Sequence, residues 1–258
     1  MTATTPPRRI SLFLNLVAAD LRNVARDGLI ATIIVAPLAV ALIFRVFVPS
    51  PEQLDLLLMP YLGDGLASEL ARAGPMLLMS LLMAIAPGLV GAVYGLLLVD
   101  ERDQRTLQVL RVMPMPFAHY MAARMITPLA LSVAMTIAAY PIAGLAPLPI
   151  VVVVMLALVG ATSAPMVALA IAAFARDKVT ALAIMRVVNS MLALPVLAYF
   201  ATPPMLYLAW FSPAYWQLKA LWLAADAAPL VVTLGIALGL NLILIVLLYT
   251  RFGRHSGA

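Results

Sequence analysis

Charged side chains are concentrated in one short segment of this sequence, from Asp100 to Arg105. Five of these six residues carry a charge, whereas 10% of the 258 residues in the chain are Asp, Glu, Lys or Arg. These residues can form ion pairs, because Glu101 precedes Arg105 by four positions, a spacing that favours a pair on one helical face. The segment is predicted to be either a short helix with a functional role or an ordinary charged loop that fixes membrane topology.

The side-chain types used in catalysis do not occur here in a combination that could form an active site. The chain has no cysteine, which excludes disulfides and cysteine-ligated zinc. Membrane transferases and proteases use paired carboxylates, histidine clusters or a serine beside a basic partner. The histidines are His119 and His255, and Ser80, Ser163 and Ser190 have no basic partner at a visible spacing. We therefore expect that the chain is not an enzyme.

The sequence also lacks the parts that drive transport. Asp100, Asp177 and Asp226 lie at the edges of apolar runs, whereas ion-coupled carriers place carboxylates and histidines inside the membrane. No G-x-x-x-x-G-K-[ST] motif is present to hold the phosphates of ATP. A transporting chain of this kind must take its energy from another polypeptide, and no cofactor is expected on this one.

Six long apolar runs position these residues. The chain is 65% apolar with a mean hydropathy of +1.07, far above the roughly 45–50% apolar content of soluble domains. Runs of about 20 apolar residues are typical of transmembrane helices. The predicted fold is an all-α integral membrane protein, a single transmembrane domain over 1–258, whose spans are 29–48, 75–99, 125–145, 148–174, 179–201 and 228–250.

Basic residues predict the orientation, because they favour the cytoplasmic side. With both termini in the cytoplasm, thirteen of the sixteen basic residues lie inside, and Arg45, Arg72 and Lys219 lie outside. The net charge of +5 then reflects topology and contact with membrane lipids, and no nucleic acid is needed to explain it.

Two segments outside the spans have an amphipathic character. In the first, 1–28, an apolar face recurs at helical spacing, which predicts a cytoplasmic tail and an interfacial helix on the inner leaflet. Its apolar residues are Ile10, Leu14, Val17, Leu21 and Val24. The second, 202–227, contains all three tryptophans and is predicted to be an aromatic anchor at the outer interface or a re-entrant segment.

The charged segment continues as an apolar stripe with Leu107, Leu110 and Met113 at a spacing of three, and Pro114 ends it. We expect a cytoplasmic amphipathic helix over 100–116. This stretch resembles the E-R-x-x-G-T-L-x-x-L-x-x-x-P run of the ABC-2 type permease family, with Arg105 in place of the glycine. The residues that carry the resemblance are Glu101, Arg102, Thr106, Leu107, Leu110, Pro114, Tyr120 and Arg124. The segment FSPAYWQLKAL at 211–221 is similar to the S/N-P-x-x-Y segment of that family.

The resemblance implies a coupling helix that docks on a separate cytoplasmic ATPase, which would hold ATP and Mg²⁺. The coupling residues implied are Glu101, Arg102, Arg105, Thr106, Leu107, Leu110 and Pro114. It also implies a second permease copy or paralogue, and residence in the bacterial cell membrane. The implied activity is export of amphipathic drug-like or lipid-like small molecules, since the compact chain is similar to bacterial drug exporters of the fluoroquinolone-export type. An ATP-independent secondary carrier or a non-transporting scaffold remains the alternative.

Methionines and amides inside the spans are a possible substrate pathway. Met76, Met79 and Met83 share one face of the second span, and methionine suits adaptable apolar binding. Asn189 and Asn241 are assigned to the same pathway. Core packing is the alternative for the methionines, and an interhelical hydrogen bond is the alternative for Asn241.

Small residues, prolines and one arginine inside the spans complete the predictions. Gly91-x-x-x-Gly95 and Gly235-x-x-x-Gly239 permit close helix approach, within the bundle or between two copies. Arg186 is predicted to extend to the inner surface, or to pair with Asp177 or a carboxylate of the coupling segment. Helix kinks are hypothesised at Pro37, Pro87, Pro165 and Pro195.

Overall fold

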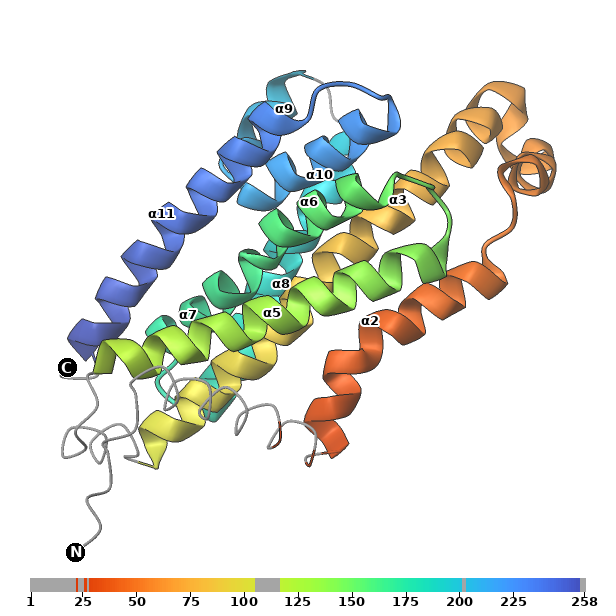
Figure 1. Ribbon diagram of the computed structural model, residues 1–258. Helices are drawn as coiled ribbons and strands as arrows, with labels where there is room; N and C mark the ends of the chain where they lie inside the picture. Colours follow the sequence, from red (N-terminus) through yellow and green to blue (C-terminus); the bar gives the residue numbers. More distant parts are fainter. Residues whose placement is uncertain (1–21, 23–25, 27, 105–116, 201–202, 256–258) are drawn as a thin grey trace, which may run out of the picture.

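The structure, a computed structural model, describes residues 22, 26, 28–104, 117–200 and 203–255 (Figure 1). In this part of the chain every regular element is a helix, and six helical segments are long and apolar enough to cross a membrane. The predicted all-α fold with six spans is therefore confirmed. The predicted interfacial helix within 1–28 lies almost wholly outside the described residues.

The spans are α2, α3, α5, α6 with α7, α8 with a 3-10 helix η1, and α11. Two shorter helices, α9 and α10, connect η1 to α11 (Figure 1). The bounds are α2 Gly28–Phe47, α3 Pro51–Asp103, α5 Phe117–Ala143, α6 Ile150–Ala161, α7 Ser163–Phe174, α8 Lys178–Ala193, η1 Leu194–Phe200, α9 Pro203–Ala209, α10 Pro213–Ala225 and α11 Val231–His255.

Helix α3 is longer than the predicted span 75–99 at both ends. It begins in a capping box in which the Ser50 side chain accepts from the Gln53 amide and the Gln53 side chain accepts from the Ser50 amide. Gly63, at φ 75°, breaks it once, and the 40 residues that follow span about 60 Å at 1.5 Å per residue. Residues 100–103 are the last turn of α3, so the prediction that a separate helix begins at 100 is wrong.

The first glycine pair packs α3 against α7. A Cβ atom at Gly91 would lie 2.4 Å from the carbonyl oxygen of Ala164, and one at Gly95 would lie 2.8 Å from Cβ of Ile171. Absence of these Cβ atoms lets the two backbones approach closely. By contrast, Cβ atoms at Gly235 and Gly239 of α11 would meet no atom within 4 Å. The close-approach prediction thus holds within the bundle for the first pair and not for the second.

Two of the predicted kinks are helix interruptions. Helix α6 ends at Ala161 and α7 begins at Ser163; Pro165 has no N–H to donate to the carbonyl four residues earlier. Helix α8 changes to the 3-10 helix η1 beside Pro195 in the same way. Pro37 and Pro87 lie inside continuous helices. The breaks place irregular backbone at the middle of two spans.

The aromatic segment folds as the helix pair α9 and α10, and α10 packs into the bundle. Its Gln217 is buried against Gly160, where a Cβ atom would lie 2.0 Å from Gln217 Nε2. Gly160 is ten residues from the start of α6, or about 15 Å along it. Trp222 donates from Nε1 to Ser80 Oγ of α3 at 2.8 Å. These contacts place α10 against α3 and α6, and the position of the segment relative to the outer membrane surface stays a prediction.

Candidate functional site

Charged residues meet where α3, α5, α7 and α8 have adjacent ends, near the end of α11 (Figure 1). We call this end of the bundle the charged rim and define it by Asp100, Glu101, Arg102, Tyr120, Arg124 and Lys178. Every member of this set makes an ion pair or hydrogen bond to another helix.

Glu101 joins α3 to α5. Its carboxylate forms an ion pair with Arg124 and accepts a hydrogen bond from the Tyr120 hydroxyl. Arg124 Nε also donates to the Tyr120 oxygen at 3.2 Å. The Glu101 and Arg124 side chains are both 15% exposed. Removal of one partner from such an enclosed pair strongly destabilises the fold, because the remaining charge stays desolvated.

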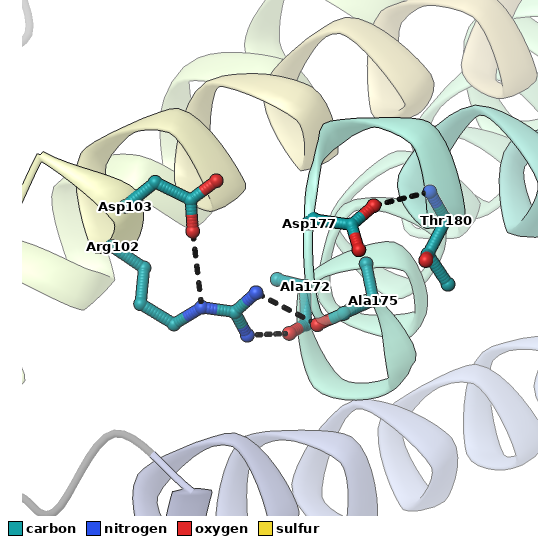
Figure 2. Close-up of polar contacts among 6 residues, drawn as sticks. All are labelled: Arg102, Asp103, Ala172, Ala175, Asp177 and Thr180. Carbon is teal, nitrogen blue, oxygen red and sulfur yellow. Dashed lines mark hydrogen bonds and ion pairs between the residues drawn. The ribbon is translucent and has the colours of Figure 1, made fainter.

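Arg102 joins α3 to the end of α7. Its Nη1 donates to the Ala172 carbonyl at 3.2 Å and its Nη2 to the Ala175 carbonyl at 2.7 Å, as Figure 2 shows. The last carbonyls of a helix have no partner within the helix and carry partial negative charge. The planar guanidinium satisfies two of them at once. Asp103, 4.0 Å from Arg102 Nε, has a side chain that is 43% exposed.

The start of α8 completes the rim. Lys178 Nζ lies 2.9 Å from Asp100 Oδ2, and this accessible pair contributes little to stability. Asp177 caps α8 by accepting from the Thr180 amide at 2.8 Å (Figure 2). That hydrogen bond holds the pKa of Asp177 below its usual range, helped by the charge of Arg102. The cap is therefore charged at neutral pH and is lost only as the pH falls through this lowered pKa.

The structure tests the coupling residues in part. Glu101 and Arg102 point to partners within the chain, so neither presents its charge freely to a docking protein. Asp103 and Gln104 are the exposed residues at the end of α3. Five other predicted coupling residues lie outside the described residues: Arg105, Thr106, Leu107, Leu110 and Pro114.

The predicted pathway residues separate into enclosed and accessible ones. Met79 and Met83 are buried in a cluster with residues of α5, α6 and α10, as core packing predicts, and Met76 packs at its edge. Asn241 is fully buried, and its Nδ2 donates to Thr162 Oγ1 of the α6–α7 break at 2.8 Å. The predicted interhelical hydrogen bond of Asn241 is confirmed.

Arg186 lies on the side of α8 that the bundle leaves open, and Asn189, three residues later, lies where α8 meets α3. The Arg186 side chain is exposed, and no carboxylate among the described residues pairs with it. The predicted pair with Asp177 is wrong, because that carboxylate caps α8. Asn189 borders a cavity of about 90 Å³ between α3 and α8, and its Oδ1 is enclosed there without a partner among the described residues.

A larger, mainly apolar cavity of about 660 Å³ lies among α7, α8, η1, α9, the start of α10 and α11. Its volume falls in the range of about 300–1,000 Å³ that holds drug-sized ligands. Met166 of α7, Met191 of α8 and Phe211 are among the residues that line it. The sequence offered Met191 as an adaptable apolar residue of the fifth span, but it did not assign Met166 or Phe211, because the cavity depends on η1 and on the segment from α9 to the start of α10, which carry no pattern of their own.

Six apolar helical spans, buried polar contacts between them and paired charges at one end define a multi-pass α-helical membrane protein. Among the described residues no group of His, Asp or Glu could hold a metal ion. The profile of the family described as "Fluoroquinolones export permease protein Rv2686c-like" matches residues 20–249. The chain belongs to this permease family, and the resemblance to ABC-2 type permeases is confirmed.

Two relatives come from strains of Mycobacterium tuberculosis. The "Fluoroquinolones export permease protein MT2760" of strain CDC 1551 / Oshkosh is 27% identical over 209 residues, which cover 80% of each chain. The "Fluoroquinolones export permease protein Rv2686c" of strain ATCC 25618 / H37Rv shows the same identity and coverage. No solved structure matches the chain.

Proposed function

We propose that the chain is the membrane-spanning subunit of an exporter that moves amphipathic, drug-like molecules out of the bacterial cell. The observation that carries this proposal is the family match over 20–249, together with two relatives named as fluoroquinolone export permeases. The apolar cavity of about 660 Å³ supports it, because its size suits such molecules.

Energy comes from a separate ATPase that docks on the segment 105–116, beside the charged rim, which faces the cytoplasm. The segment 105–116 connects α3 to α5 at this rim, and Glu101 with Arg124 ties those two helices together beside it. A force applied to the segment therefore acts on both helices at once. Glu101 and Arg102 serve as the fixed base of the coupling segment, and the apolar stripe with Leu107 and Leu110 makes the contact.

A transport assay tests the source of energy. The chain and an ABC ATPase that co-purifies with it are reconstituted in inside-out vesicles, and uptake of a fluoroquinolone is measured with ATP or with an imposed proton gradient. We expect uptake that requires ATP and an intact nucleotide site on the ATPase. Uptake driven by the proton gradient without the ATPase would establish the secondary carrier instead.

A second test addresses the contact surface. Leu107→Asp and Leu110→Asp place a charge on the apolar stripe and should abolish stimulation of the ATPase by the chain. Gln108→Asp places the same charge about 160° away from the centre of the stripe, at 100° per residue, and is the matched control. Equal loss of stimulation in all three variants, with unchanged melting temperatures, would contradict a contact through this face.

A further inference from the structure

Arg186 is unusual in its depth. Away from the terminal turns of the six apolar runs, it is the one Asp, Glu, Lys or Arg residue in the sequence. It lies eight residues from Lys178, the first residue of α8, which places its Cα about 12 Å from the charged rim. Its side chain is exposed on the open face of α8. A charged side chain at such depth is costly in lipid and marks a polar pathway or ligand site.

The carboxylates at and beside the charged rim already have partners. Asp100 pairs with Lys178, Glu101 pairs with Arg124, and Asp177 caps α8. In addition, no acidic residue occurs within the apolar runs themselves. Among the described residues, no carboxylate pairs with the Arg186 cation, so an anionic ligand is the complementary group.

Asn189 provides a second polar group next to Arg186, at the edge between the open face of α8 and its contact with α3. It follows Arg186 by three positions, so the two Cβ atoms lie about 5–6 Å apart. Its Oδ1 is turned into the cavity of about 90 Å³ and has no partner among the described residues. Gly88 makes room for this amide, because a Cβ atom there would lie 3.0 Å from Oδ1. With its oxygen turned inward, the amide has its NH₂ donors left for a ligand.

We propose that Arg186 and Asn189 form an anchor point for the carboxylate of the exported molecule, so that the permease prefers amphipaths bearing a carboxylate. This inference rests on the proposed export function. The cavity beside Asn189 is far smaller than a drug-sized site and encloses the Asn189 oxygen. The carboxylate therefore binds outside this cavity, between the Asn189 NH₂ group and the Arg186 guanidinium. The apolar body of the molecule lies along the open face of α8 and the start of η1, where Leu182, Val187 and Leu194 are 42%, 57% and 59% exposed.

The test compares a fluoroquinolone with its methyl ester, which keeps the ring system and removes the carboxylate charge. Binding is measured on the purified chain alone, as the concentration of each compound that raises its melting temperature. Transport is measured with the ATPase in vesicles of phosphatidylcholine alone, which removes anionic lipid as a competing partner for the arginine. The variants are Arg186→Gln, Arg186→Lys and Asn189→Leu, with Arg176→Gln as a control that removes an exposed cation outside the span.

We expect Arg186→Gln to weaken binding of the acid by about ten- to a hundredfold, the range for a hydrogen bond to a charged group, and to leave the ester within about twofold. Arg186→Lys should retain part of the preference, because it keeps the charge and loses the planar fork. Equal effects on acid and ester, or none on either, would overturn the inference. Preference for the acid without ATP-driven transport of either compound would instead overturn the proposed function and leave the binding site standing.

Discussion

Substitution of Gly91 by Ala adds one carbon atom at the tightest contact between α3 and α7. The new Cβ would lie 2.4 Å from the Ala164 carbonyl oxygen and 2.8 Å from Cβ of Val167. Both are atoms of the facing helix close to its axis, so no flexible side chain can move aside. The two helices must separate by about 1 Å to restore ordinary contact, which is about 3.5 Å or more between heavy atoms.

The size of the effect follows from a matched control. Overpacking of a close contact costs about 1–3 kcal/mol, and replacement of Gly by Ala within a helix gains up to about 1 kcal/mol. Gly235→Ala has the same gain and adds no contact within 4 Å. The difference between the two variants is therefore the overpacking cost alone, which corresponds to a difference in Tm of about 2–12 °C.

The measurement is the melting temperature of each purified variant in the same detergent. Gly91→Ala should melt below the unchanged protein, and Gly235→Ala should melt at or above it. Gly95→Ala and Gly239→Ala form a second pair of the same design. A Cβ atom at Gly95 would lie 2.8 Å from Cβ of Ile171, and one at Gly239 would meet no atom within 4 Å. If Gly91→Ala melts at or above Gly235→Ala, α3 and α7 do not pack on the glycine face.

Three further predictions concern polar and close contacts, each checked by melting temperature. Arg102→Lys keeps the charge but loses the fork that binds two α7 carbonyls, so we expect a loss of about 1 kcal/mol; no loss would show that the charge alone suffices. Gly160→Ala should be destabilising because its Cβ would meet Gln217 Nε2 at 2.0 Å, and Gln217→Ala should restore stability in the double variant. Asn241→Leu removes the hydrogen bond to Thr162 and should cost about 0.6 kcal/mol, and at most about 1.7, as interhelical bonds in membranes do; a larger loss would indicate a wider polar network.

Sequence was sufficient for the spans, because a run of about 20 apolar residues has few other uses. It also predicted a hydrogen bond for Asn241, since an amide inside a span needs a partner. The identity of that partner, Thr162, could not be predicted, because it depends on the break between α6 and α7. The start of α3 at Ser50 did have a signal, since Ser50 and Gln53 have the spacing of a capping box.

The sequence predicted the charged rim as a segment but not its contacts with other helices. The i, i+4 rule favoured a pair between Glu101 and Arg105, which lies outside the described residues, and the structure shows a pair between Glu101 and Arg124. That pair depends on how α3 and α5 align as antiparallel neighbours, which local spacing does not determine. Arg102 binds backbone carbonyls of α7. Every residue has a backbone carbonyl, so the sequence does not show which ones accept a hydrogen bond.

The contacts of α3 indicate which parts of the bundle move together. Glu101 ties α3 to α5 beside the coupling segment, Arg102 ties it to the end of α7, and Gly91 and Gly95 hold the α3 and α7 backbones together. A packed contact of this kind has little freedom to slide without clashes. Helix α8 differs, because only two of its sixteen residues are buried. Its C-terminal end continues as the 3-10 helix η1 beside a cavity. Helix α8 and η1, which carry Arg186 and border the larger cavity, are therefore freer to rearrange than the packed pair of α3 and α7.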